Sequence, residues 1–161
     1  MSTVRYLHAT ESTITPAHQQ NAKRKRILVV EDNQLNSKLL KQLLTAHGYE
    51  VLESPEGLQA LDLARDEQPD VILMDIRLPD LSGLEVTRLL KQDDQTKTIP
   101  IIAITAIANP ENEKRGLGIG CDAYTSKPIN LGNLLRTIES FLKIRPATLA
   151  TLASITPPGW V

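Results

Sequence analysis

Five polar side chains of this sequence stand where short apolar runs end, which is where a sheet-based fold places its chemistry. They are Glu31, Asp32, Asp75, Thr105 and Lys127. In open α/β sheets, ligands bind beyond the carboxyl ends of the strands, at the point where the strand order reverses. We therefore expect three carboxylates, one hydroxyl and one ammonium to converge on one edge of a sheet.

Such a group of carboxylates favours a divalent cation. Three neighbouring carboxylates repel one another, which raises at least one pKa. Mg²⁺ removes the repulsion, because it prefers oxygen ligands and commonly uses one or two carboxylates together with phosphate oxygens. The ammonium of Lys127 can neutralise Asp75 and later hold a phosphoryl oxygen, and the Thr105 hydroxyl can donate to another. Since a carboxylate can attack phosphorus, the sequence indicates phosphoryl transfer to Asp75.

The elements that must position these groups alternate along the chain between short apolar runs and helical periodicity. Four-residue runs rich in β-branched residues, and a weaker fifth, predict five strands. They are 27–30, 50–53, 71–74, 101–104 and 122–125. Nearly unbroken aliphatic runs are typical of parallel strands, which are buried on both faces. With a helix after each strand, the pattern predicts a doubly wound α/β fold, a parallel sheet between two layers of helices.

The apolar spacing also predicts how each helix packs. In the first helix, Leu35, Leu39, Leu40, Leu43 and Leu44 form one apolar face, and Gly48 occupies the position just past its end. Further apolar stripes predict a second helix at 60–64, after Pro55 in its first turn, and a last helix at 131–142.

Two helices carry more specific expectations. The third helix is expected to begin with a capping box of Ser82 and Glu85 and to bury its leucines, which are Leu84, Leu89 and Leu90. The fourth, around 110–119, contains Gly116 and Gly118, each of which costs about 1 kcal/mol relative to alanine in a helix interior. We expect that helix to be short, frayed or mobile.

Composition limits what else the protein can be. The 161 residues leave room for one folded domain, predicted at 26–144, between an N-terminal extension at 1–25 and a C-terminal tail at 145–161 that is either a short docking helix or a loose tail. A single cysteine, Cys121, excludes an internal disulfide, and a small buried apolar role is expected for it. With no signal peptide and no membrane-spanning run, we expect a cytoplasmic protein that binds no membrane.

Charge argues against nucleic acid as a partner. Residues 27–145 carry 13 basic and 18 acidic side chains, a poor match for a phosphate backbone. Residues 1–26 have a balance of +4, mostly from the basic run 23–26. That run either solubilises the chain beside the first strand or touches nucleic acid, and the first alternative is favoured.

The motifs around the five polar residues, taken together, resemble the receiver domains of two-component response regulators. The shared segments are Val29–Asn33, Met74-Asp75, Leu78-Pro79, Ser82–Leu84, Thr105-Ala106 and Lys127-Pro128. The resemblance covers about residues 26–143 and implies a CheY-like, flavodoxin-like fold with strand order 2-1-3-4-5. The stretches VEDNQLNSKLL and GCDAYTSKPI are similar to single-domain division-control regulators of the DivK type.

The resemblance implies a role for each residue of the site. Asp75 would accept a phosphoryl group from a sensor histidine kinase or a histidine phosphotransfer protein. Mg²⁺ would be held by Asp32, by Glu31, by Asp75 and by the backbone carbonyl of Arg77. Thr105 and Lys127 would hold the phosphoryl oxygens, Tyr124 would be the switch aromatic, and the Lys127–Pro128 peptide would be cis.

The resemblance has consequences for output and lifetime as well. The protein would be a phosphoacceptor and no enzyme beyond its own phosphorylation and slow self-dephosphorylation. Its downstream protein is expected to dock on the face of the fourth helix, fifth strand and last helix, because a helix weakened by glycines costs little to re-order. Two residues that gate water beside the acyl phosphate in this family are Arg77 and Ile107 here, which implies slow loss of the phosphoryl group.

Competing interpretations of the same residues are weaker. A phosphatase of the haloacid-dehalogenase type needs an acidic residue where this sequence has Arg77, and a cap domain. An FMN carrier needs an uncharged phosphate loop where Glu31 and Asp32 stand. A DNA-binding regulator needs an output domain, and only 18 residues follow Lys143. Individually, Glu31 and Asp32 could serve a helix dipole, and Tyr124 could be plain packing.

Overall fold

A computed structural model describes residues 23–107 and 109–143, which form a five-stranded parallel sheet with five helices. The strands are β1 (Arg26–Val30), β2 (Glu50–Ser54), β3 (Val71–Asp75), β4 (Ile101–Thr105) and β5 (Ala123–Ser126). Their order in the sheet is β2-β1-β3-β4-β5, and every neighbouring pair is parallel. The predicted fold class and strand order are therefore confirmed. Most of the predicted N-terminal extension and all of the predicted tail at 145–161 lie outside the described residues.

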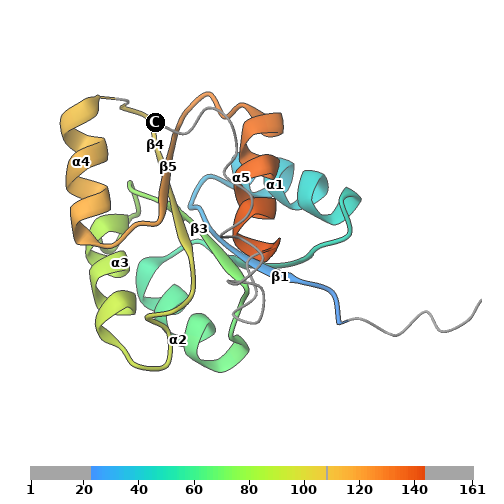
Figure 1. Cartoon of the computed structure of the whole chain (residues 1–161), viewed down its shortest axis with the longest axis horizontal. Helices are drawn as coiled ribbons and strands as arrows, with labels where there is room; N and C mark the ends of the chain where they lie inside the picture. The colour runs from blue at the N-terminus through green and yellow to red at the C-terminus, as the bar shows by residue number, and fades with distance from the viewer. Residues whose placement is uncertain (1–22, 108, 144–161) are drawn as a thin grey trace, which may run out of the picture.

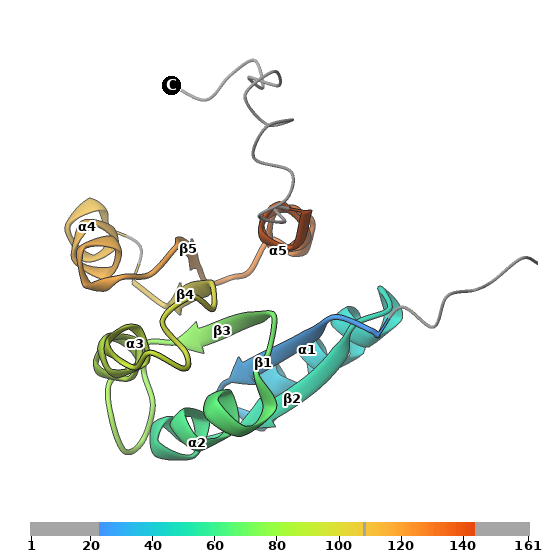
Figure 2. The same cartoon turned by 60° about the horizontal axis from the view of Figure 1, so that its bottom comes forward.

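Helices cover both faces of the sheet. They are α1 (Gln34–Ala46), α2 (Gly57–Glu67), α3 (Gly83–Gln92), α4 (Pro110–Ile119) and α5 (Leu131–Lys143). Helices α1 and α5 lie on one side of the sheet, and α2, α3 and α4 lie on the other (Figures 1 and 2). In the described chain, no helix combines the length and the apolar character needed to cross a bilayer. The cytoplasmic location stays a prediction.

The alternation of side chains along the strands builds a separate core on each face. Ile27 and Val29 of β1 point into the core beneath α1 and α5, where Leu134 is buried. Leu28 and Val30, one residue on, point into the core beneath α2 and α3. Because successive strand residues face opposite sides, an unbroken aliphatic strand supplies both cores at once.

The predicted apolar face of α1 is only half right. Leu40 and Leu44 are buried in the core, but Leu35 and Leu39 are 66% and 55% exposed. The apolar stripe is wider than the contact that α1 makes with the sheet, so its first turns leave two leucines in water. The helix ends as predicted, with Gly48 at φ +88° just beyond it.

The capping box predicted at the start of α3 does not form. The Ser82 hydroxyl accepts from the Leu84 amide, and Glu85 pairs with the guanidinium of Arg88 instead of completing a capping box. Leu90 is buried as expected, whereas the other deeply buried side chains of α3 are Val86 and Thr87.

The fourth helix lies where it is predicted, around residues 110–119, and its fraying or mobility stays a prediction. All ten residues from Pro110 to Ile119 are helical. Asn109 caps the helix by accepting the Asn112 amide at 2.7 Å, and Pro110 occupies the first turn, where its missing N–H costs nothing. These start signals and the burial of Gly116 offset the low helix propensity of its glycines.

Candidate functional site

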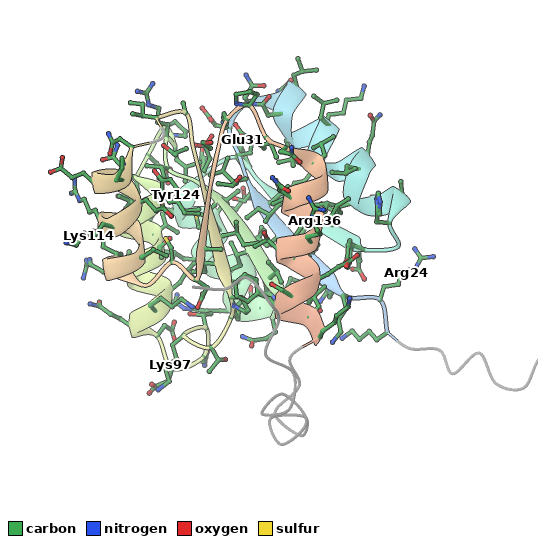
Figure 3. All side chains as sticks on the ribbon, turned by 45° about the horizontal axis from the view of Figure 1, so that its top comes forward. Arg24, Glu31, Lys97, Lys114, Tyr124 and Arg136 are labelled. Carbon is green, nitrogen blue, oxygen red and sulfur yellow. The ribbon has the colours of Figure 1, made fainter. Side chains whose placement is uncertain are left out.

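The carboxyl edge of the central strands gathers the charged residues that the sequence predicts to converge. Asp75 is the last residue of β3, and Glu31 follows β1, its neighbour in the sheet. Both are buried, with residue exposures of 3% and 4%. Figure 3 shows Glu31 at one end of the sheet, far from Lys97 at the other. Two acidic groups are thus held side by side at this edge by the pairing of β1 with β3.

Lys127 connects the two buried carboxylates. Its Nζ lies 2.8 Å from Asp75 Oδ2 and 3.1 Å from Glu31 Oε2. The lysine follows β5 and precedes Pro128, and the peptide bond between them is cis, as predicted. One ammonium therefore holds groups from the ends of β1, β3 and β5 together, although 96 residues separate Lys127 from Glu31 in sequence.

Burial and charge act in opposite directions on this group. Loss of water raises the pKa of Glu31, and the neighbouring Asp75 charge adds to the rise, against a smaller opposing effect from Lys127. Burial alone would lower the pKa of Lys127, but its hydrogen bonds to Asp75 and Glu31 outweigh that effect and raise it. Two buried carboxylates against one ammonium leave the site with an excess of negative charge, which favours a further cation.

Asp32 completes a cluster that fits a metal ion. One oxygen from each of Glu31, Asp32 and Asp75 lies within 4.8 Å of the other two. Asp32 is exposed while its two partners are buried, so the cluster opens to water on one side. Three hard oxygen donors with an open side fit Mg²⁺, which keeps several waters when it binds.

The loop after β3 is tied to the same site. The Arg77 amide donates to Asp75 Oδ1 at 2.9 Å, so this oxygen is held by the loop while Oδ2 is held by Lys127. The Gly83 amide donates to the Ile76 carbonyl at 2.8 Å and closes the loop. The Arg77 side chain is exposed.

Thr105 and Tyr124 make local contacts. Thr105 Oγ1 accepts from the Ile107 amide at 3.2 Å and lies 3.3 Å from the Ile107 carbonyl oxygen. The Tyr124 hydroxyl donates to that carbonyl at 3.4 Å. Tyr124 lies on the side of the sheet that α4 covers, and its ring lies beside Gly116 (Figure 3). The segment after β4 thus links the threonine to the tyrosine.

Two features of the site do not follow from the sequence. The first is the bond from Lys127 to Glu31, since the sequence does not indicate Glu31 as a direct partner of the lysine. The second is Asp80, whose carboxylate accepts from the amides of Gly57 and Leu58 at the start of α2, each at 2.8 Å. A partner 22 or 23 residues away leaves no local signal, because capping motifs are recognised only within one turn.

Comparison with known proteins agrees with this geometry. The family model "Response regulator receiver domain" matches residues 27–139. The polar-differentiation response regulator DivK of Brucella anthropi is 52% identical over 118 residues, which cover 73% of this chain and 96% of the relative. DivK of Brucella ovis shows the same identity and coverage.

Solved structures share the fold. A putative response regulator from Chloroflexus aurantiacus superposes with a TM-score of 0.73 at 28% identity, covering 76% of this chain and all of that one. The receiver domain of a sensor histidine kinase from Pseudomonas aeruginosa PAO1, with a magnesium ion coordinated in its active-site cleft, gives a TM-score of 0.70 at 34% identity over 75% of this chain and 99% of that one. On the family match and the identity to its relatives, this chain belongs to the response regulator receiver domain family.

Proposed function

We propose that Asp75 is the phosphoacceptor of this receiver domain and that its donor is the phosphohistidine of a kinase or phosphotransfer protein. Phosphorylation of an aspartate is the general mechanism of the family. The observation that carries the assignment is the position of Asp75, between the Lys127 ammonium at 2.8 Å and two further carboxylates. Other carboxylates in the described chain pair with cations, but no other group of three could hold a metal.

The transfer needs little covalent chemistry from the protein. A carboxylate oxygen of Asp75 attacks phosphorus, the P–N bond of the phosphohistidine breaks, and the imidazole nitrogen keeps the electron pair and takes up a proton. Lys127 holds Asp75 in place and offsets negative charge on the phosphoryl oxygens. Asp32, Glu31 and the Arg77 carbonyl would hold Mg²⁺ beside Asp75, and the ion supplies charge neutralisation for the transferring group.

An apolar groove beside the site fits the docking of the donor. Leu39 of α1 and Leu131 of α5 line a groove of about 330 Å³ together with Lys127 and Pro128. Leu35, Leu39 and Leu131 are each about half or more exposed. A partner helix laid across these leucines would bring its histidine to the edge that holds Asp75. We assign this surface, named the α1–α5 groove, to the donor.

Output belongs to a different surface. We assign the downstream protein to the face formed by α4, β5 and α5, where Leu117 is 46% exposed. Attraction of the Thr105 hydroxyl to a phosphoryl group would break its contacts with Ile107, and Tyr124 holds the same carbonyl. Tyr124 would thereby report the state of Asp75 to that face. The protein acts in this scheme as a phosphoacceptor that signals through protein contacts, without nucleic acid.

Labelling with radioactive acetyl phosphate and Mg²⁺ tests the assignment. Wild type should take up an acid-stable, base-labile label, and Asp75→Asn should take up none while remaining folded. Asp70→Asn is a matched control, because Asp70 lies at the opposite end of β3 and pairs with Lys25. Label that persists in Asp75→Asn would refute the proposal.

A further inference from the structure

We propose that Asp80 is a positioning residue for the metal site, because it clamps the loop between β3 and α3 to the start of α2. This inference rests on the proposed function, since that loop carries the Arg77 carbonyl assigned to Mg²⁺. The clamp consists of two hydrogen bonds that one carboxylate accepts: Oδ1 accepts from the Gly57 amide and Oδ2 from the Leu58 amide, both at 2.8 Å.

Helix α2 depends on this distant partner at its start. Its own N-cap residue, Glu56, makes no side-chain capping bond. The Gly57 amide belongs to a buried residue, and a buried N–H without a partner is costly. Asp80 therefore does for α2 what a local cap does for other helices, but from a loop that also leads to the metal site.

Close packing makes the clamp rigid. A Cβ at Gly57 would lie 2.5 Å from Val86 Cγ2, 3.4 Å from Asp80 Oδ1 and 3.5 Å from Leu78 Cδ1. Glycine is the residue that lets α2 come this close to both the loop and α3. The loop is thus held at its middle by Asp80, while its ends are held by the Arg77 amide on Asp75 and the Gly83 amide on Ile76.

Reciprocity links the clamp to the ion. If the clamp holds the Arg77 carbonyl where a metal needs it, metal binding must stabilise the clamp by the same factor. Groups that orient metal ligands typically contribute a factor of about 10 to 100 in metal affinity. We expect a value near the lower end, about tenfold, because the carboxylate ligands are held independently of the loop.

The test measures the Mg²⁺ dissociation constant of the full chain by NMR titration in wild type, Asp80→Ala, Asp80→Asn and Asp93→Ala. Asp93 is the matched control: it accepts the Gln95 amide at 2.9 Å and the Arg65 guanidinium at 2.6 Å, and so ties α2 to the far end of α3. The dissociation constant should rise about tenfold in Asp80→Ala and by less in Asp80→Asn, whose single amide oxygen can still accept one of the two hydrogen bonds. It should stay unchanged in Asp93→Ala.

Each alternative has its own outcome. Equal effects of Asp80→Ala and Asp80→Asn would mean that both carboxylate oxygens are needed and would support the clamp. An unchanged dissociation constant in Asp80→Ala would overturn the clamp, and so would equal effects of Asp80→Ala and Asp93→Ala, which would mean general destabilisation of α2. Failure of the wild type to bind Mg²⁺ would instead overturn the proposed function. If Asp80→Ala does not fold, hydrogen exchange of backbone amides in the wild type provides the test. The clamp requires that Mg²⁺ slow the exchange of the Gly57 and Leu58 amides and leave the exchange of the Gln95 amide unchanged.

Discussion

The ammonium of Lys127 lies 2.8 Å from Oδ2 of Asp75 and 3.1 Å from Oε2 of Glu31, so a single cation bridges two buried carboxylates. Removing it in Lys127→Ala leaves both acidic groups without that partner and withdraws a donor from the phosphoryl oxygens. We expect the rate of phosphorylation by acetyl phosphate to fall by about a hundredfold. Rates from stopped-flow or phosphate-affinity gels give the measurement.

A second lysine–aspartate pair supplies the control for that prediction. Lys91 Nζ lies 2.8 Å from Asp122 Oδ2, at the end of the sheet remote from Asp75. Lys91→Ala should be less stable than wild type, but the folded variant should be phosphorylated at the wild-type rate. A Lys127→Ala protein that is phosphorylated as fast as wild type would show that the ammonium has no part in the transfer.

The two proposed surfaces are separable by charge substitutions at exposed leucines. Leu39→Glu in the α1–α5 groove should slow phosphotransfer from a histidine kinase or phosphotransfer protein by about tenfold, because interface centres tolerate buried charge poorly. Acetyl phosphate needs no docking, so labelling by it should be unchanged. Leu117→Glu on α4 should leave both phosphorylation reactions unchanged and should weaken the binding of a downstream partner instead. The same loss with acetyl phosphate would place the defect of Leu39→Glu in the site and not in docking.

How far the sequence alone predicts the molecule depends on the range of each interaction. The strands follow from aliphatic runs such as 71–74, because burial on both faces leaves a continuous apolar signal. The cluster of Glu31, Asp75 and Lys127 follows from the rule that strand ends share an edge. Contacts set by tertiary packing cannot be predicted from the sequence in this way. The exposure of Leu39 and the hydrogen bond between Asp80 and the Gly57 amide depend on how neighbouring elements pack.

In helix α4, capping and packing outweigh local helix propensity. Propensity alone predicts a weak helix because of Gly116 and Gly118, but the helix starts with a strong cap at Asn109, at the end opposite to these glycines. Gly116 is buried beside the Tyr124 ring, where a small residue permits contact. Local propensity is a weaker guide there than capping and packing.

Replacement of two glycines by alanine should change the free energy of unfolding in opposite directions. A Cβ at Gly83 would lie 2.0 Å from the Asp75 carbonyl oxygen, a contact that the backbone cannot relieve without moving the site, so Gly83→Ala should cost about 3 kcal/mol of unfolding free energy or more. Gly118 has no atom within 4 Å of its Cβ position, and Gly118→Ala should gain about 1 kcal/mol through helix propensity. Urea denaturation measures both. A gain in Gly83→Ala would contradict the close approach of α3 to the end of β3.

The Asp80 clamp should make the free energy of unfolding depend on pH. Hydrogen bonds from the amides of Leu58 and Gly57 lower the pKa of Asp80 below its ordinary value. A carboxyl whose pKa is lowered by folding stabilises the protein above its unfolded pKa of about 3.9, and that contribution is lost as the pH falls through the folded pKa. The difference in urea midpoint between wild type and Asp80→Asn should therefore shrink from about pH 6 to about pH 3. A constant difference over that range would show that the clamp does not depend on ionised Asp80.

The phosphorylated protein should lose its phosphoryl group slowly. Arg77 lies two residues after Asp75, and Ile107 lies two after Thr105; both side chains are exposed, with Ile107 at 49%. A long cation and an apolar group at these positions would restrict the approach of water to the acyl phosphate. We expect Arg77→Ala and Ile107→Ala to hydrolyse faster than wild type, by about tenfold when combined, which corresponds to about 1.4 kcal/mol of barrier. Leu58→Ala, at an exposed leucine on α2, should keep the wild-type rate. A wild-type half-life of seconds would show that these side chains leave the acyl phosphate open to water.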